Sequence, residues 1–318
     1  MPDCKPDNES RERARETTRA VFGDTVFLRA LIEISSHCSR DCLYCGLRRS
    51  HRRLARYRMA RDEVLVAARA ALQAGLRTVV LQAGDDPGLG RGEVCDLIRG
   101  IKALEPEAAV TLSLGERPRR DYRAFREAGA DRYLLKFETS DPGLYRRLRP
   151  GRELRERLDV LALLADLGYE VGTGNIVGLP GQERGSLERD LELLAEIAPE
   201  MVGTGPFLPQ SRTPLGDAPP GDPEQALDFL AAVRLALPRA NIPATTALGS
   251  LGENYPVEAL RTAANVLMVG FTPAAVRDGY AIYDRRARFS PARAGNAARA
   301  AGKRASGERG DSPARRTA

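Results

Sequence analysis

The stretch IEISSHCSRDCLYCG, residues 32–46, joins an apolar run to three closely spaced cysteines. The apolar run starts at Phe27 and is rich in the aliphatic and β-branched residues that favour a buried strand. Cys38, Cys42 and Cys45 follow it with the spacing C-x3-C-x2-C. Thiols crowded into one short loop are typical of proteins that bind a metal or a metal–sulfur cluster. The stretch therefore predicts a first strand that ends in a chemically active loop.

The same alternation of strand and loop continues along the chain, with helical segments in between. The strand-like runs cover residues 27–35, 78–84, 109–115, 132–139, 170–178, 201–208, 242–248 and 265–271. The helical segments cover residues 61–76, 92–104, 120–130, 155–169, 185–197 and 222–237. Such a series predicts an α/β fold, a (β/α)8 barrel of the TIM type over residues 24–286. An open doubly wound sheet is the structural alternative. In such barrels the chemistry lies after the carboxyl ends of the strands, where the cysteines stand.

The two ends of the chain differ from this middle part. Residues 1–23 form a short, charged extension without the apolar centre of a secretory signal, and no run of 18 apolar residues follows. We therefore expect a cytoplasmic protein with no membrane role. From Ala287 to Ala318 eight Lys/Arg residues face two Asp/Glu residues, so this tail accounts for the whole net charge of +6. The tail has almost no large apolar residues, which predicts disorder and no specific nucleic-acid partner.

The number of cysteines in the loop indicates what they bind. Four cysteines close the coordination shell of a structural or electron-transfer site, whereas three leave one iron of a [4Fe–4S] cube open to a ligand. Zinc is the alternative, because His37 adjoins Cys38 and a Cys3His set binds zinc. Adjacent residues in a tight loop rarely ligate one ion together, which favours the cluster. Cys95 lies in a predicted amphipathic helix and is interpreted as a core residue.

The cysteine spacing, with Tyr44 directly before Cys45, resembles the signature of the radical S-adenosylmethionine (SAM) superfamily. The resemblance implies a [4Fe–4S] cluster held by Cys38, Cys42 and Cys45, with SAM on the open iron. It also implies a low-potential electron donor of the ferredoxin or flavodoxin type. By position, the residues implied to contact SAM are Tyr44, Gln82, Gly84, Asp85, Thr111, Glu138 and Arg157. QAGDD at residues 82–86 matches the superfamily's Gly-Gly-Glu turn in part, and a tight turn with a helix cap is the alternative.

Longer stretches resemble one branch of that superfamily, the HydE-type maturase of [FeFe]-hydrogenase. They include VGLPGQ (177–182), GTGPFLPQSRTPL (203–215) and NIPATTALG (241–249), within a match from about residue 23 to 283. The resemblance implies an enzyme that acts on a small, sulfur-containing, cysteine-derived substrate during assembly of the hydrogenase diiron subcluster. Other hydrogenase maturases would be its partners. The positions matching the family's catalytic cavity are Lys136, Met201, Thr245, Thr246, Met268 and Tyr283.

Two departures from that family keep alternatives open. The family commonly carries Arg-His-Glu at the end of the fourth strand, where this chain has Lys136, Phe137 and Glu138. Many members also have C-terminal cysteines for an accessory cluster, whereas no cysteine follows Cys95, so we expect no second cluster. A diverged enzyme of the biotin synthase or methylornithine synthase type, acting on another small molecule, is one alternative. A non-catalytic iron–sulfur or zinc-binding protein is the other.

Overall fold

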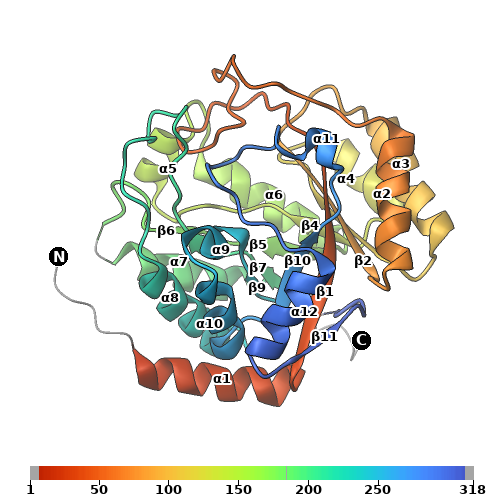
Figure 1. The fold of residues 1–318 in the computed structure, drawn as a ribbon. Helices are drawn as coiled ribbons and strands as arrows, with labels where there is room; N and C mark the ends of the chain where they lie inside the picture. The colour runs from red at the N-terminus through yellow and green to blue at the C-terminus, as the bar shows by residue number, and fades with distance from the viewer. Residues whose placement is uncertain (1–6, 184, 312–318) are drawn as a thin grey trace.

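The computed structural model describes residues 7–183 and 185–311. Eight parallel strands form its centre, in the order β7-β5-β4-β3-β2-β1-β10-β9, and helices surround them (Figure 1). The strands are β1 (Thr25–Ser35), β2 (Thr78–Ala83), β3 (Ala109–Ser113), β4 (Arg132–Leu134), β5 (Glu170–Thr173), β7 (Met201–Val202), β9 (Pro243–Ala244) and β10 (Val266–Gly270). This is a nearly closed (β/α)8 barrel, as predicted, and the doubly wound alternative is excluded.

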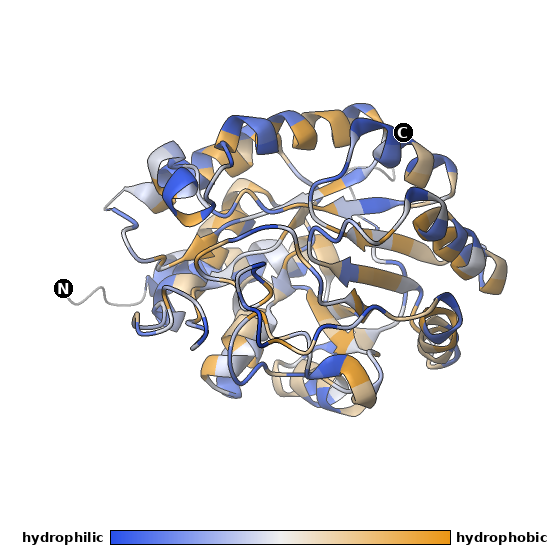
Figure 2. Cartoon of the chain, turned by 90° about the horizontal axis from the view of Figure 1, so that it is seen from above, coloured by the Kyte–Doolittle hydropathy of each residue, from blue (hydrophilic) through white to orange (hydrophobic). Residues whose placement is uncertain are grey.

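The surrounding helices are α2 (Arg61–Gln73), α3 (Arg91–Leu104), α4 (Arg119–Glu127), α5 (Pro142–Leu148), α6 (Leu154–Asp166), α7 (Ser186–Ile197), α8 (Pro223–Ala236), α9 (Thr246–Leu251), α10 (Asn254–Thr262) and α11 (Ala274–Arg277). Hydrophobic and hydrophilic residues alternate along them (Figure 2), because one face of each helix covers the strands. Strand side chains alternate likewise. Val79 and Leu81 pack in the core with the helices, whereas Val80 and Gln82 face the barrel interior. Cys95 is buried in the same core, as predicted.

The barrel closes through one short contact. Met201 of β7 forms an isolated parallel bridge with Asn241, just before β9. Above this bridge the β5 and β7 segments continue as β6 (Ile176–Val177) and β8 (Gly205–Pro206), which pair with each other. The predicted strand at 242–248 is shorter than expected, because Thr246 begins α9 and turns the chain across the mouth of the barrel. This turn brings polar side chains to the carboxyl ends of the strands.

The amino-terminal end of the barrel is covered by both ends of the chain. Helix α1 (Asn8–Phe22) lies under it and is joined to α8 by Arg11, which pairs with Glu224 and Asp228. From the other end, α12 (Pro291–Ala300) packs outside β10 and against α10, and β11 (Arg304–Ser306) follows it at the start of β1. Strand β11 pairs in parallel with the start of β1. The prediction that the chain is disordered from residue 287 is therefore wrong for residues 287–311, and residues 312–318 lie outside the described residues.

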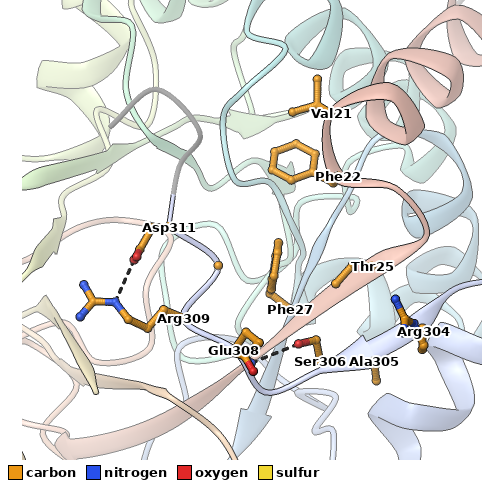
Figure 3. A pocket seen from close by; sticks show the side chains of 11 residues that line it. Val21, Phe22, Thr25, Phe27, Arg304, Ala305, Ser306, Glu308, Arg309 and Asp311 are labelled. Atoms are coloured by element: carbon orange, nitrogen blue, oxygen red, sulfur yellow. Dashed lines mark hydrogen bonds and ion pairs between the residues drawn. The ribbon is translucent and has the colours of Figure 1, made fainter. Parts of the chain in front are cut away.

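Buried polar contacts explain why the tail is ordered despite its composition. The guanidinium of Arg132 is fully buried and donates to Glu170 at 2.7 Å and to Asp311 at 2.5 Å. Asn241 donates to the carbonyl of Gly310 at 2.9 Å. Figure 3 shows the adjoining cavity of about 640 Å³, with the Arg309–Asp311 ion pair on one side and aromatic rings on the other. Charged anchors of this kind stabilise a segment that composition alone marks as disordered.

No helix in the described part of the chain is both long and apolar enough to cross a membrane.

Candidate active site

One cavity of about 400 Å³ lies at the carboxyl ends of the barrel strands. Its walls come from the loops after β1 and β2, from the ends of β3 and β4, and from the segments around β8, β9 and β10. The residues singled out from the sequence that line it are Cys38, Cys42, Tyr44, Cys45, Gln82, Gly84, Asp85, Lys136, Glu138, Arg157, Thr245, Thr246, Met268 and Tyr283. The fold thus brings the cysteine loop and the strand-end residues to one place.

Two residues singled out from the sequence do not line this cavity. Thr111 is buried in β3, and its Oγ1 atom has no hydrogen-bond partner. Met201 is buried in β7, where its sulfur lies 3.1 Å from Nη1 of Arg29. Both side chains come earlier in their strands than the cavity-lining residues Ser113 and Gly203. They therefore lie in the barrel interior beneath the cavity.

The cysteine loop is fixed by the turn after β2. A Cβ atom on Gly84 would lie 2.7 Å from the Cβ of Cys38 and 2.7 Å from the carbonyl oxygen of His37. Only glycine therefore allows the two loops to approach so closely. Ser39 also donates its backbone N–H to the carbonyl of Asp85 at 2.9 Å. These contacts give a physical reason for the glycine of QAGDD, which the sequence alone left between two interpretations.

The three thiols fit a metal–sulfur cluster better than a single ion. Burial raises the pKa of Cys38 to about 11 and also raises the pKa values of Cys42 and Cys45, so the free thiols stay protonated. Bound iron deprotonates such thiols. Among residues 7–183 and 185–311, no three His, Cys, Asp or Glu side chains converge on a site for one ion. The three cysteines nevertheless line one cavity, which is what a larger cluster requires.

Glu138, beyond the end of β4, is held in an unusual backbone conformation. Its φ of +70° is in the left-handed region, which costs a non-glycine residue about 1–3 kcal/mol. The backbone is fixed on both sides, because Glu138 N–H donates to Gly174 O at 3.0 Å and its carbonyl accepts from Ile176 at 2.9 Å. The buried Oε2 atom lies 3.3 Å from Nζ of Lys136 and accepts no hydrogen bond. This carboxylate is therefore positioned in advance for a cationic ligand.

A buried hydrogen-bond network supports the Glu138 loop. Asp190 of α7 accepts from the backbone and hydroxyl of Ser140, at 2.6 and 2.5 Å, and from the amide of Asn175 at 2.7 Å. Thr204 in turn donates to Asn175 at 2.7 Å. Burial raises the pKa of Asp190, although these donors oppose the shift. The network joins the loops after β4, β5 and β7 into one rigid wall.

Glu116 is an important residue that was not identified from the sequence. Its carboxylate pairs with Arg157 at 2.8 Å, Arg152 at 2.5 Å and Arg40 at 3.1 Å, and Arg40 also binds Asp85 at 2.5 Å. Burial alone would raise the pKa of Glu116, but the guanidinium groups around it, above all that of Arg157, lower it overall. The sequence did contain one indication of its role: Glu116 is the first acidic residue after β3, and such a position lies at the mouth of the barrel.

Arg149 is a second residue that was not identified from the sequence. It is buried, lines the cavity, and lies with its guanidinium 5.3 Å from the centre of the Tyr145 ring. Its Nε atom has no hydrogen-bond partner. The guanidinium is thus a buried cation with a donor still available beside the cysteine loop. No spacing pattern distinguishes it from the other arginines of its segment.

Hydroxyl groups also line the cavity. The hydroxyls of Thr246 and Tyr283 lie 2.5 Å apart and share one hydrogen bond. Burial raises the pKa of Tyr283 to about 12, so the phenol stays neutral. The Oγ1 atom of Thr245 is buried and has no hydrogen-bond partner. Together with the ammonium of Lys136, these groups can bind a polar or carboxylate-bearing molecule.

Comparisons with known proteins agree with this site. A family model described as the radical SAM superfamily matches residues 32–194, and the chain is a radical SAM enzyme. It is 47% identical over 270 residues to the [FeFe] hydrogenase maturase subunit HydE of Thermotoga maritima, covering 85% of this chain and 77% of that protein. Within the superfamily the chain therefore belongs to the HydE family, as its sequence motifs predicted.

Two further relatives lie in neighbouring branches. Biotin synthase of Bordetella avium is 31% identical over 277 residues, which is 83% of each chain. The crystal structure of methylornithine synthase (PylB) superposes with a TM-score of 0.84 at 27% identity, covering 94% of this chain and 88% of that one. Membership of the superfamily implies a [4Fe–4S] cluster and SAM.

Proposed function

We propose that this chain is a maturase for [FeFe]-hydrogenase, acting on a small, sulfur-containing, cysteine-derived substrate. The observation that carries the proposal is that one cavity is lined both by the three cysteines and by Lys136, Thr245, Thr246 and Tyr283. The sequence identity to HydE over most of the chain supports a role in hydrogenase maturation. The proposal includes a cytoplasmic location, a ferredoxin- or flavodoxin-type electron donor, the other hydrogenase maturases as partners, and one cluster per chain.

The residues of the cavity divide into those toward the cofactors and those toward the substrate. When bound, the cluster and SAM supply reductive cleavage of SAM to methionine and a 5′-deoxyadenosyl radical. In our proposal Cys38, Cys42 and Cys45 hold the cluster. Glu138 and the Gln82–Asp85 turn bind the amino group of SAM. Tyr44 and Gly84 shape the wall of the cavity on which SAM lies.

A buried guanidinium is suited to the carboxylate of SAM. Arg157 donates Nε to Glu116 and Nη1 to the carbonyl of Lys136, both at 2.8 Å. Its Nη2 group remains available, and the two bonds fix the plane of the guanidinium. The substrate would then bind between Lys136 and the hydroxyl groups of Thr245, Thr246 and Tyr283. Thr111 and Met201 would support this site from the barrel interior, beneath the cavity.

The proposal is tested in two steps. After anaerobic reconstitution, SAM and dithionite are added and 5′-deoxyadenosine is measured by chromatography. We expect the wild type to bind about four irons per chain and to form 5′-deoxyadenosine when the cluster is present. Cys42→Ala should form none. A Cys42→Ala protein that still cleaves SAM contradicts the cluster assignment. The wild type is next added to a hydrogenase maturation mixture that lacks only its HydE component. Restored hydrogenase activity supports the maturase function.

A second function is favoured by one observation. Lys136 and Phe137 stand where HydE-type sequences commonly have Arg and His, and lysine lacks the planar fork that binds a carboxylate through two hydrogen bonds. The chain would then act on another small molecule, as the biotin synthase and methylornithine synthase relatives do. SAM cleavage without restored hydrogenase activity would favour this alternative. A Lys136→Arg variant that regains the activity would locate the difference at this residue.

A further inference from the structure

The loop that follows the cysteines is strongly basic. Residues 47–60, LRRSHRRLARYRMA, contain six arginines and no acidic residue. This loop is part of the long connection between β1 and α2, which crosses the carboxyl end of the barrel at the top of Figure 1. The proposed cluster cysteines lie immediately before it in the chain. A strong local positive potential is therefore present next to the site where an electron must enter.

Three of the six arginines are already used within the protein. Arg48 pairs with Asp41 at 2.9 Å, and Arg58 pairs with Asp86 at 2.7 Å. Arg56 donates to backbone carbonyls and so shapes the loop. The other three, Arg49, Arg52 and Arg53, are exposed.

Those three arginines, which we call the basic patch, are not neutralised locally. Within residues 7–183 and 185–311, their side chains form no hydrogen bond or ion pair. Three positive charges therefore face solvent on one short segment. Surface charges that have no internal partner remain available to an external partner of opposite charge.

The basic patch is rigidly attached to the cysteine loop. Arg49 N–H donates to the carbonyl of Arg40 at 2.7 Å, and the His51 ring bonds the carbonyl of Gly46 at 2.8 Å. Arg56 donates through Nη2 to the carbonyl of Arg48 at 2.7 Å. Arg49 is four positions after Cys45 in the chain, so their Cα atoms are at most about 14 Å apart. A protein bound to the patch would thus be held close to the cluster.

We infer that the basic patch is the docking surface for an acidic, low-potential electron-carrier protein. The inference rests on the proposed function, since a radical SAM enzyme needs one electron for each cleavage. The carrier is oxidised by one electron and the cluster is reduced by one electron. Complementary charge speeds the encounter of the two proteins and orients them. Because the rate of electron transfer falls steeply with distance, a patch next to the cluster favours the productive orientation.

The composition of the patch favours an acidic protein over a nucleic acid. Single-stranded nucleic acids bind where exposed aromatic rings alternate with basic residues. Tyr57 is the single Phe, Tyr or Trp residue among residues 47–60. Its hydroxyl donates to the carbonyl of Glu33 at 2.7 Å. The ring of Tyr57 is only partly exposed and is packed against the main core.

The test compares a patch variant with a control variant of equal charge. The patch variant is Arg49→Glu, Arg52→Glu and Arg53→Glu together. The control is Arg13→Glu, Arg69→Glu and Arg123→Glu, which are exposed arginines on α1, α2 and α4 without ion pairs in the described structure. The probe is a purified acidic flavodoxin in its hydroquinone state. Its binding is measured by calorimetry at low and moderate salt, and cluster reduction is followed by bleaching in stopped flow.

We expect the patch variant to lose at least tenfold in flavodoxin affinity and in the rate of cluster bleaching. Iron content and dithionite-driven reduction should match those of the wild type, and wild-type binding should weaken with salt. The control variant should change less than twofold. Equal losses in both variants, or no loss in the patch variant, would overturn the inference. So would tight binding of a single-stranded RNA oligonucleotide to the patch with unchanged flavodoxin binding.

Failure of the proposed function would be seen separately. In that case dithionite yields a reduced cluster but no 5′-deoxyadenosine. The binding and bleaching measurements do not need SAM cleavage, so they decide the docking surface in either case.

Discussion

Replacing Gly84 by alanine should disconnect the cysteine loop from the turn that supports it. The new Cβ would lie 2.7 Å from the Cβ of Cys38, 2.7 Å from the carbonyl oxygen of His37 and 3.0 Å from the sulfur of Cys38. Cβ atoms in proteins do not approach backbone and Cβ neighbours so closely, and no flexible side chain is available to move. Overpacking of this kind costs about 1–3 kcal/mol. The resulting displacement would affect Cys38, the first of the proposed cluster ligands.

The assay has a stability part and a cluster part. In cluster-free protein, each kcal/mol should lower the melting temperature by about 2–4 °C. After anaerobic reconstitution, the variant should retain less than half of the wild-type iron and of the cluster absorbance, with SAM cleavage reduced in proportion or more. The matched control is Gly92→Ala in α3, where an added Cβ meets nothing within 4 Å. That change should be neutral or stabilising by up to about 1 kcal/mol.

A Gly84→Ala protein with wild-type melting temperature, iron content and SAM cleavage would refute this reasoning. It would mean that the turn after β2 does not position the cluster loop. Loss of iron in the Gly92→Ala control as well would show that the assay reports general instability rather than this contact.

Three other changes have definite expected outcomes. Glu138→Gly should relieve the left-handed strain and raise stability by about 1 kcal/mol, while SAM binding measured by calorimetry weakens; lower stability would contradict the strain assignment. Glu116→Gln should destabilise the protein by about 3–5 kcal/mol at pH 7, because buried Arg157 loses its partner. The pKa of Glu116 is lower in the folded protein, so its carboxylate adds to the free energy of unfolding at pH values above the ordinary pKa near 4.3. That stabilisation is lost as the pH falls through the folded pKa. The melting temperatures of wild type and variant should therefore converge in acid. A chain ending at Lys303 should melt lower than one ending at Asp311, because Arg132 then loses its contact to Asp311; equal melting curves would show that the tail does not stabilise the barrel.

The features predicted correctly from the sequence are those that depend on local pattern. Each strand of a parallel barrel is an apolar run, and each strand end opens on the same side, so residues such as Lys136 and Thr245 were expected to converge. The structure shows that they do. The cysteine spacing and Tyr44 are likewise contained within eight residues, so the likeness to the radical SAM signature did not require the fold.

What the sequence did not show depends on distant partners. Glu116 is one acidic residue among 43 until Arg40, Arg152 and Arg157 are seen to converge on it. The tail from residue 287 was predicted to be disordered, because a composition with few large apolar residues does not reveal that a distant, buried guanidinium such as that of Arg132 will anchor it. Met201 was expected at the cavity from resemblance alone, and its depth in the barrel emerges only when strand register is known.

The pairing of β1 with strands from the far end of the chain constrains how the protein can be made. One edge of β1 meets β2, which follows soon afterwards in the sequence, and at its start β11, whereas the other edge pairs with β10. During synthesis the β10 edge of β1 lacks its partner until residues 266–270 have left the ribosome. The barrel must therefore close after translation is nearly complete, and a nascent chain carries an open, apolar strand edge for most of its synthesis.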